Sequence, residues 1–300
     1  MASIAVVGVG SIGGFFAARA VATGRHNVRL CVRRPFARLR LETGSSISEH
    51  PVPVHTDPTE VGVVEWVLLA TKTYQTPATA PWLRALCGSG TKVAVLQNGV
   101  EHRERVAPFA GEAEVLPAVV YCDASAVAPG HIVHYGGNRL IVPDVPAAYE
   151  FQRLFVGADV QVEIDRDFTT AVWTKLCRNV AANSVTAITG QRLNIFQRPD
   201  VAALGLALIE ECMAVGVKEG ARLGTTPANR VVDLSRFPSD GSTSMLHDRL
   251  AGRPLEYDAL NGAVVRLAAR HGLEVPLNRA VSALLGAISD AQIPPEGNHA

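Results

Sequence analysis

The sequence lacks the features that mark secreted, metal-stabilised and membrane-spanning proteins. It has five cysteines in 300 residues, an odd number without CxxC spacing, which favours reduced thiols over a disulfide framework or a zinc site. No apolar stretch is long and uninterrupted enough to span a bilayer. The apolar start, residues 4–21, has no basic leader and carries Arg19, which argues against a secretory signal peptide. These absences predict a cytoplasmic protein that does not bind membranes.

Net charge is absent as well, because 28 basic residues balance 28 acidic ones. Without a long-range field of either sign, the sequence gives no reason to expect nucleic acid as a partner. The histidines are scattered, and His131 and His134 fall on opposite faces of an expected strand, so no metal site is predicted. A small molecule is the expected partner.

Strands and helices are expected to alternate in the first half of the chain. Short β-prone runs occur at 4–7, 28–32, 63–70, 93–96 and 115–121. Such alternation is typical of a doubly wound parallel sheet of the Rossmann type. A hairpin that joins 131–135 to 139–142 through Gly136-Gly137-Asn138 is expected to close the sheet on one side.

The second half of the chain reads as all-α. From Asp167 onward the strand signal stops, and apolar residues recur at helical spacing near 168–187, 199–222, 244–251, 255–271 and 277–290. The length favours two domains, an α/β domain at 1–166 and a helical domain at 167–293, before a loose tail at 294–300. The Ala- and Leu-rich stretch 199–222 has more apolar surface than one neighbouring helix covers. A homodimer through the helical domain is therefore a hypothesis.

A glycine-rich turn directly follows the first expected strand. The segment Gly8-Val9-Gly10-Ser11-Ile12-Gly13 has the spacing GxGxxG between a strand and a helix. Gly8 permits the tight turn, Gly10 lets a pyrophosphate approach the backbone, and Gly13 allows close packing of helix on strand. In this context the motif predicts a dinucleotide site.

Arginine stands where NAD-specific sites carry an acidic residue, after the second strand. The residues there are Arg33 and Arg34. A guanidinium group suits a 2′-phosphate, whereas a carboxylate would repel it, so NADPH/NADP+ is favoured over NAD. An ordinary basic surface loop is the alternative, since Arg38 and Arg40 follow closely.

Polar residues also follow the third and fourth strands. Lys72 comes after the third, and Asn98-Gly99 after the fourth. Because the carboxyl ends of parallel strands line the ligand crevice, both side chains are expected at the nicotinamide end of the cofactor or at the substrate. Asn-Gly also signals a hairpin turn, but the helical pattern of 101–106 leaves no returning strand.

Three polar residues interrupt the apolar pattern of 168–188 at positions i, i+4 and i+8. Lys175, Asn179 and Asn183 therefore lie along one helix face. A solvated face is the alternative, although such faces more often carry Lys, Glu and Arg. A lysine in a dry cleft can act as the general acid in reduction of a ketone, and asparagine amides can bind the substrate oxygens.

Two later segments place hydroxyl and carboxylate groups beside expected helix starts. The first runs from Ser242 to Asp248 and contains Ser244, and the second runs from Gly252 to Asp258 and contains Glu256. A hydroxyl can cap a helix or receive a substrate carboxylate there. Glu256 suits the dipole of a first helical turn, and it can also pair with a lysine or accept a hydrogen bond from a substrate hydroxyl.

Taken together, these motifs resemble the ketopantoate reductase (2-dehydropantoate 2-reductase) family over nearly the whole chain. The resemblance implies NADPH-dependent reduction of ketopantoate, a small 2-oxo acid, to D-pantoate for pantothenate and coenzyme A synthesis. It implies that Lys175 is the general acid and that Glu256 binds the hydroxyl end of the substrate or holds the site's geometry. It implies cofactor binding by Gly8, Gly10, Gly13, Arg33 and Lys72, and substrate binding by Asn98, Asn179, Asn183 and Ser244.

Two positions depart from the pattern of some family members. Gly241 and Leu193 stand where those members have asparagine, and Asn194 comes one place late. The departures bear on the identity of the 2-oxo acid more than on the reduction. The main alternative is a D-2-hydroxyacid dehydrogenase acting on another branched or aromatic 2-oxo acid. A non-catalytic NADP-sensing regulator is disfavoured, because it would need neither Lys175 nor Glu256.

Overall fold

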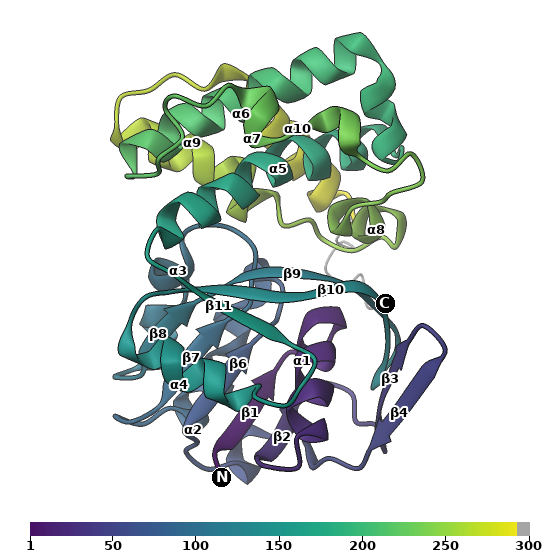
Figure 1. Ribbon diagram of the computed structural model, residues 1–300, viewed down its shortest axis with the longest axis vertical. Helices are drawn as coiled ribbons and strands as arrows, with labels where there is room; N and C mark the ends of the chain where they lie inside the picture. Colours follow the sequence, from purple (N-terminus) through teal and green to yellow (C-terminus); the bar gives the residue numbers. More distant parts are fainter. Residues whose placement is uncertain (293–300) are drawn as a thin grey trace, which may run out of the picture. The chain divides into compact units, whose positions relative to one another are not determined.

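The computed structural model describes residues 1–292, and the chain divides into two compact units between Phe168 and Thr169 (Figure 1). The first unit contains the strands and helices α1 to α4. The second contains α6 to α10 and all but the first residue of α5. The loose tail expected at 294–300 lies outside the described residues.

The first sheet of unit 1 is parallel throughout. In spatial order its strands are β5 (Val54–His55), β2 (Asn27–Cys31), β1 (Ser3–Val7), β6 (Trp66–Leu69), β7 (Lys92–Val95) and β8 (Glu114–Pro117). Both faces are buried, which explains why these strands read as continuous runs of Val, Ile and Leu. The predicted doubly wound parallel sheet is confirmed.

Two hydrophobic cores flank this sheet. Ile4 and Val6 of β1 belong to the core that contains residues of α1 (Ser11–Ala22) and α4 (Pro146–Leu154). Ala5 and Val7 belong to the core that contains residues of α2 (Ala80–Leu86) and α3 (His102–Ala110). Alternate residues of one strand therefore serve opposite layers.

A second sheet in unit 1 was not expected from the sequence. Its strands are β11 (Gln161–Asp165), β10 (His131–Pro143), β3 (Leu39–Thr43) and β4 (Ser46–His50), with β9 (Val119–Ala128) paired to β10. Residues of β3, β9, β10 and β11 share a core with α1, so this sheet covers the helix that follows the glycine turn.

The predicted hairpin through Gly136-Gly137-Asn138 is wrong. Residues 131–143 form the single strand β10, and its antiparallel partner is β9. The chain turns between them at Gly130, which has a φ of 74°. The ladder shifts register on both sides of Gly136, because glycines serve a bulge inside a strand as readily as a turn.

Unit 2 is helical in its described part. Its helices are α5 (Phe168–Thr189), α6 (Pro199–Lys218), α7 (Ala228–Val231), α8 (Ser244–Leu250), α9 (Asn261–Arg270) and α10 (Pro276–Asp290). The segment expected at 255–271 is divided into a short 3-10 turn, Tyr257–Ala259, and α9. A Cβ on Gly216 of α6 would lie 2.9 Å from the ring of Trp173 on α5, so these helices pack with no room for a side chain. The predicted succession of a parallel sheet and an all-α region is confirmed.

Candidate active site

The glycine turn has the three properties that the motif predicts. Gly8 has a φ of 91°, and a Cβ there would lie 2.6 Å from Thr71 Cγ2. A Cβ on Gly13 would lie 2.0 Å from the Gly8 carbonyl oxygen, so only glycine permits this contact of helix and strand. A Cβ on Gly10 would meet nothing within 4 Å. The turn is therefore tightly packed at Gly8 and Gly13 and open at Gly10, where a ligand can approach the backbone.

The start of α1 offers backbone donors rather than side chains. Gly10 is the N-cap and makes no side-chain cap bond, and the first turn contains no acidic residue. Val9 and Ile12 pack against the core, so their contribution to a ligand is limited to the backbone. The Ser11 hydroxyl oxygen accepts a hydrogen bond from the backbone N–H of Ala126 at 3.0 Å, which leaves its proton able to donate. Uncapped N–H groups at a helix start favour an anion.

Arg33 and Arg34 lie beside this turn. They follow Cys31, whose backbone pairs with Val7 next to the glycines. Both side chains are exposed, and neither has an ion pair or hydrogen bond among residues 1–292. Their guanidinium groups are thus available to an anionic ligand.

Lys72 and Asn98 lie at the same sheet edge as the glycine turn. Leu69 of β6 pairs with both Val7 and Val95, so the carboxyl ends of β1, β6 and β7 are aligned. Lys72 and Asn98 are half-buried. Gly99 follows with a φ of 102°, and the chain continues into α3 rather than into a returning strand.

A buried glutamine beneath these loops was missed in the sequence. Gln97 is 5% exposed, and its carboxamide nitrogen donates to the Thr71 carbonyl at 3.0 Å and to the Thr76 hydroxyl at 3.0 Å. It connects the loop after β6 to the end of β7. The available signal was its position, since it directly precedes Asn98 at the end of an apolar strand.

The polar stripe of α5 is not a solvated face. Lys175 and Asn179 are half-buried, and Asn183 is 5% exposed. The carboxamide oxygen of Asn183 accepts a hydrogen bond from the backbone N–H of Met245 at 3.5 Å. Since Met245 belongs to the first turn of α8, the structure brings the stripe next to Ser244.

Thr243, rather than Ser244, caps α8. Its hydroxyl oxygen accepts from Leu246 N at 3.2 Å, and it shares a 2.7 Å hydrogen bond with the Thr186 hydroxyl of α5. Ser244 is the first residue of α8 and is exposed, with no partner in the described part of the chain. Because Thr243 caps the helix, the Ser244 hydroxyl is available to a ligand.

Glu256 is a buried carboxyl at the start of the Tyr257–Ala259 turn. It is 6% exposed, and the preceding Leu255 N–H donates to the Ser289 hydroxyl of α10 at 2.9 Å. A carboxyl at such low exposure requires polar partners. Its environment fits a positioning or binding role better than that of a surface residue.

Comparison with known proteins identifies the family of this chain. The family profile "Ketopantoate reductase PanE/ApbA" matches residues 4–147, and its C-terminal counterpart matches residues 167–289. The 2-dehydropantoate 2-reductase of Mycobacterium tuberculosis is 44% identical over 290 residues, which cover 96% of this chain and 98% of the relative. The corresponding protein of Caulobacter vibrioides is 41% identical over 291 residues, 96% of this chain and 99% of its own. This chain belongs to the ketopantoate reductase family.

Solved structures of the ketopantoate reductase family have the same fold. A PanE/ApbA family ketopantoate reductase from Ralstonia eutropha is 32% identical and covers 97% of this chain and 99% of its own, with a TM-score of 0.88. The parallel sheet and the helical region described above are therefore the family's architecture.

Leu193 and Gly241, where the family resemblance led us to expect asparagine, contact each other. Leu193 N donates to the Gly241 carbonyl at 2.9 Å, and a Cβ on Gly241 would lie 2.9 Å from Leu193 Cδ1 and 2.6 Å from Pro238 Cγ. An asparagine at 241 does not fit beside Leu193 and Pro238 as they stand.

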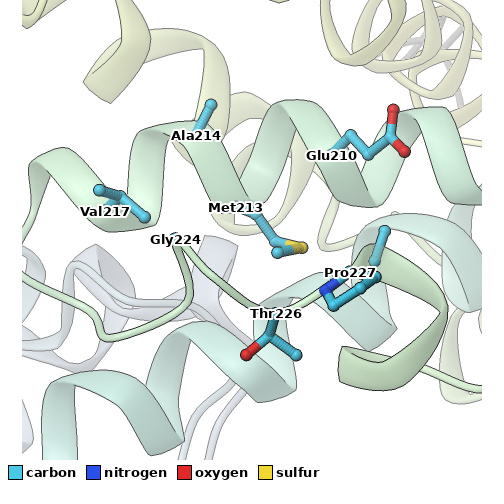
Figure 2. Close-up of a pocket in the computed structure, with 8 residues that line it drawn as sticks. Glu210, Met213, Ala214, Val217, Gly224, Thr226 and Pro227 are labelled. Atoms are coloured by element: carbon cyan, nitrogen blue, oxygen red, sulfur yellow. The ribbon is translucent and has the colours of Figure 1, made fainter.

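A pocket on α6 does not coincide with any predicted site residue. It is lined by Glu210, Met213, Ala214, Val217, Gly224, Thr226, Pro227 and Ala228 (Figure 2). Its one charged group is a carboxylate, which would repel a 2-oxo acid. Residues 1–292 contain no cluster of three metal-ligating side chains, and all five cysteines are free. None of the described helices is long and apolar enough to cross a membrane.

Proposed function

We propose that this protein is an NADPH-dependent 2-dehydropantoate 2-reductase, which converts ketopantoate to D-pantoate in pantothenate biosynthesis. The observation that carries the proposal is the α5 face, where half-buried Lys175 and Asn179 share a stripe with Asn183, which is bonded to the start of α8. A general acid, amide donors and a carboxylate-binding hydroxyl are the groups that reduction of a 2-oxo acid requires.

The residues at the sheet edge fit NADPH. Open space above Gly10 and the uncapped start of α1 suit the pyrophosphate, and the unpaired Arg33 and Arg34 suit the 2′-phosphate. Lys72 and Asn98 would hold the nicotinamide half. When bound, NADPH supplies the hydride to the keto carbon.

Lys175 supplies the proton in this mechanism. Its ammonium group donates a proton to the keto oxygen, so that the keto group becomes an uncharged hydroxyl, and the lysine regains a proton from solvent. The amide group of Asn179, four residues further along the same helix, donates a hydrogen bond to a substrate oxygen. Partial burial strengthens these interactions, because less water screens them.

Ser244 and Glu256 would hold the two ends of the substrate. The Ser244 hydroxyl, not used as a cap, donates to the carboxylate. The Glu256 carboxylate accepts a hydrogen bond from the hydroxyl end of ketopantoate or pairs with Lys175. Binding at both ends fixes the position of the keto group, and such orientation contributes to the rate.

The test is loss of NADPH absorbance with ketopantoate, run beside pyruvate, 2-oxoisovalerate and phenylglyoxylate. We expect a preference for ketopantoate that Lys175→Ala abolishes and that Lys218→Ala, on the exposed end of α6, leaves unchanged. Turnover with another acid alone would transfer the assignment to a different 2-oxo acid reductase. Binding of NADPH without turnover of any acid would favour a sensor.

One observation favours a 2-oxo acid other than ketopantoate as the substrate. The buried side chain of Leu193 packs against Gly241, which precedes Ser244 by three residues. If this segment borders the substrate, an apolar wall would suit a 2-oxo acid without the terminal hydroxyl of ketopantoate. The same assay decides between them.

A homodimer through the helical unit remains a hypothesis. Leu204 and Val217 of α6 are 38% and 41% exposed, which leaves apolar surface uncovered on that helix. Sedimentation as a monomer at working concentration would remove the hypothesis.

A further inference from the structure

Gln97 occupies a buried position between the loops that follow β6 and β7. Its carboxamide nitrogen donates to the Thr71 carbonyl at 3.0 Å, the Thr71 hydroxyl at 3.1 Å and the Thr76 hydroxyl at 3.0 Å. The Thr76 hydroxyl in turn donates to the carboxamide oxygen at 3.3 Å. Both polar atoms of the side chain are therefore used within the protein, and Gln97 is not placed to bind a ligand itself.

Thr71, which is bonded to Gln97, also packs against the glycine turn at Gly8. A Cβ on Gly8 would lie 2.6 Å from Thr71 Cγ2 and 2.7 Å from Thr71 N, so the two segments pack without space for a side chain. Lys72 is the next residue, and its backbone N–H donates to the Gln75 side chain at 3.3 Å. By fixing Thr71, the glutamine fixes a residue that touches Gly8 and adjoins Lys72.

The backbone of Gln97 is held as well. Its carbonyl accepts a hydrogen bond from His102 Nε2 at 3.1 Å, and His102, 5% exposed, is the first residue of α3. Asn98 follows directly, beyond the last residue of β7, where ladder bonds no longer restrain the chain. The His102 contact replaces that restraint.

We propose that Gln97 is a positioning residue that holds the Thr71–Lys72 segment and Asn98 in fixed register at the carboxyl ends of β6 and β7. It acts through Lys72 and Asn98, which would meet the cofactor and the 2-oxo acid as a preformed surface. The proposal rests on the proposed function, because these two residues need accurate placement only if they hold ligands. A displacement of about 1 Å in such a group can cost up to roughly a hundredfold in rate.

The variants Gln97→Ala and Gln97→Glu test this role against a matched control, Thr79→Val. Thr79 is equally buried, and its hydroxyl donates to the Thr76 carbonyl at 2.7 Å without contacting Gln97. We expect Gln97→Ala to lower kcat/KM at least about tenfold and to raise KM for NADPH. Thr79→Val should lose comparable thermal stability with both KM values unchanged.

Gln97→Glu adds a pH-dependent readout. Burial raises the pKa of an introduced carboxyl, and its protonated form, like the amide, donates a hydrogen bond. Activity relative to wild type should therefore recover as the pH falls from about 8 to about 5. A role confined to general stability would not restore kcat/KM in this way.

Hydrogen–deuterium exchange in the absence of ligand separates this proposal from the proposed function. Gln97→Ala should speed exchange in residues 71–76 and 98–101, whereas Thr79→Val should leave 98–101 as in wild type. If Gln97→Ala exchanges like wild type there, or loses stability with unchanged KM and kcat, the positioning role is wrong. If wild type neither binds NADPH nor reduces a 2-oxo acid, the proposed function fails, and with it the reason for Gln97 to place Lys72 and Asn98 for ligands.

Discussion

The carboxamide oxygen of Asn183 accepts a hydrogen bond from the backbone N–H of Met245, at 3.5 Å. This contact joins α5, which carries Lys175, to the first turn of α8, which carries Ser244. A second hydrogen bond, 2.7 Å long, joins the hydroxyl of Thr186 on α5 to that of Thr243, the cap of α8. The proposed proton donor and the proposed carboxylate site are thus held by one pair of helices.

Asn183→Ala should weaken both folding and catalysis. Removing the acceptor deprives the buried Met245 N–H of a long hydrogen bond, which costs about 0.5–1.5 kcal/mol of unfolding free energy. Displacement of Ser244 should lower kcat/KM by roughly tenfold. Urea unfolding and steady-state kinetics measure the two effects, with Asn229→Ala, on the exposed side of α7, as the control. Unchanged kinetics in Asn183→Ala would show that this helix contact does not place the substrate site.

Gly10→Ala should separate cofactor binding from stability. Gly10 has φ −88° and ψ −155°, which alanine adopts readily, and its Cβ would meet nothing within 4 Å. The unfolding free energy should therefore not fall, and it should rise by up to about 1 kcal/mol because alanine restricts the unfolded chain more than glycine does. A methyl group in the path of the pyrophosphate should weaken NADPH binding roughly tenfold or more. Fluorescence titration measures the affinity, and Gly90→Ala, also in open space, is the control. Full affinity in Gly10→Ala would contradict the predicted approach of the phosphates.

Arg33→Ala should alter the choice between NADPH and NADH. The guanidinium group is exposed and unpaired among residues 1–292, so its loss should leave the fold intact. Loss of a charge-assisted bond to the 2′-phosphate should raise KM for NADPH by about tenfold to a hundredfold, with little effect on KM for NADH. Arg103→Ala, which removes an equally unpaired exposed arginine from α3, should change neither. An equal effect on both cofactors would assign Arg33 another role.

Part of the fold was predictable because local sequence and final environment agree. The strands β1, β6 and β7 are buried on both faces and carry continuous apolar runs, and the glycine motif follows β1 directly. The strand β3 gave no such signal, since Arg40 and Glu42 interrupt it and its partner β10 lies far along the chain. Gly136 and Gly137 suggested a turn, since paired glycines are common in turns. That they form a bulge becomes visible only when β10 pairs with β9.

The candidate site residues divide in the same way. Lys175, Asn179 and Asn183 could be found by helical spacing, since their chemistry and their periodicity are both local. Gln97 could not, because its partners Thr71 and Thr76 come beside it only when β6 and β7 pair. The sequence also could not show that Thr243 caps α8, because the Thr243 hydroxyl is held by Thr186 of another helix.

Cys31 should make the protein lose stability at alkaline pH. Burial raises the pKa of its thiol to about 12, with Arg29 opposing the shift. Because the folded state binds this proton more tightly than the unfolded state, the stabilisation is complete below the unfolded pKa of about 8.5 and is lost as the pH rises toward about 12. The loss is of the order of a few kcal/mol over that window.

The difference in unfolding free energy between Cys31→Ala and wild type measures this effect. Both would be unfolded in urea at about pH 8 and about pH 10.5, where the wild-type thiol should cost the folded state roughly 1.4 kcal/mol per pH unit above 8.5. Val67→Ala, a truncation in the same core without a titratable group, should differ from wild type by the same amount at both values. If Cys31→Ala behaves like Val67→Ala, the thiol ionises as easily in the folded protein as in the unfolded chain, and its burial does not control the alkaline limit.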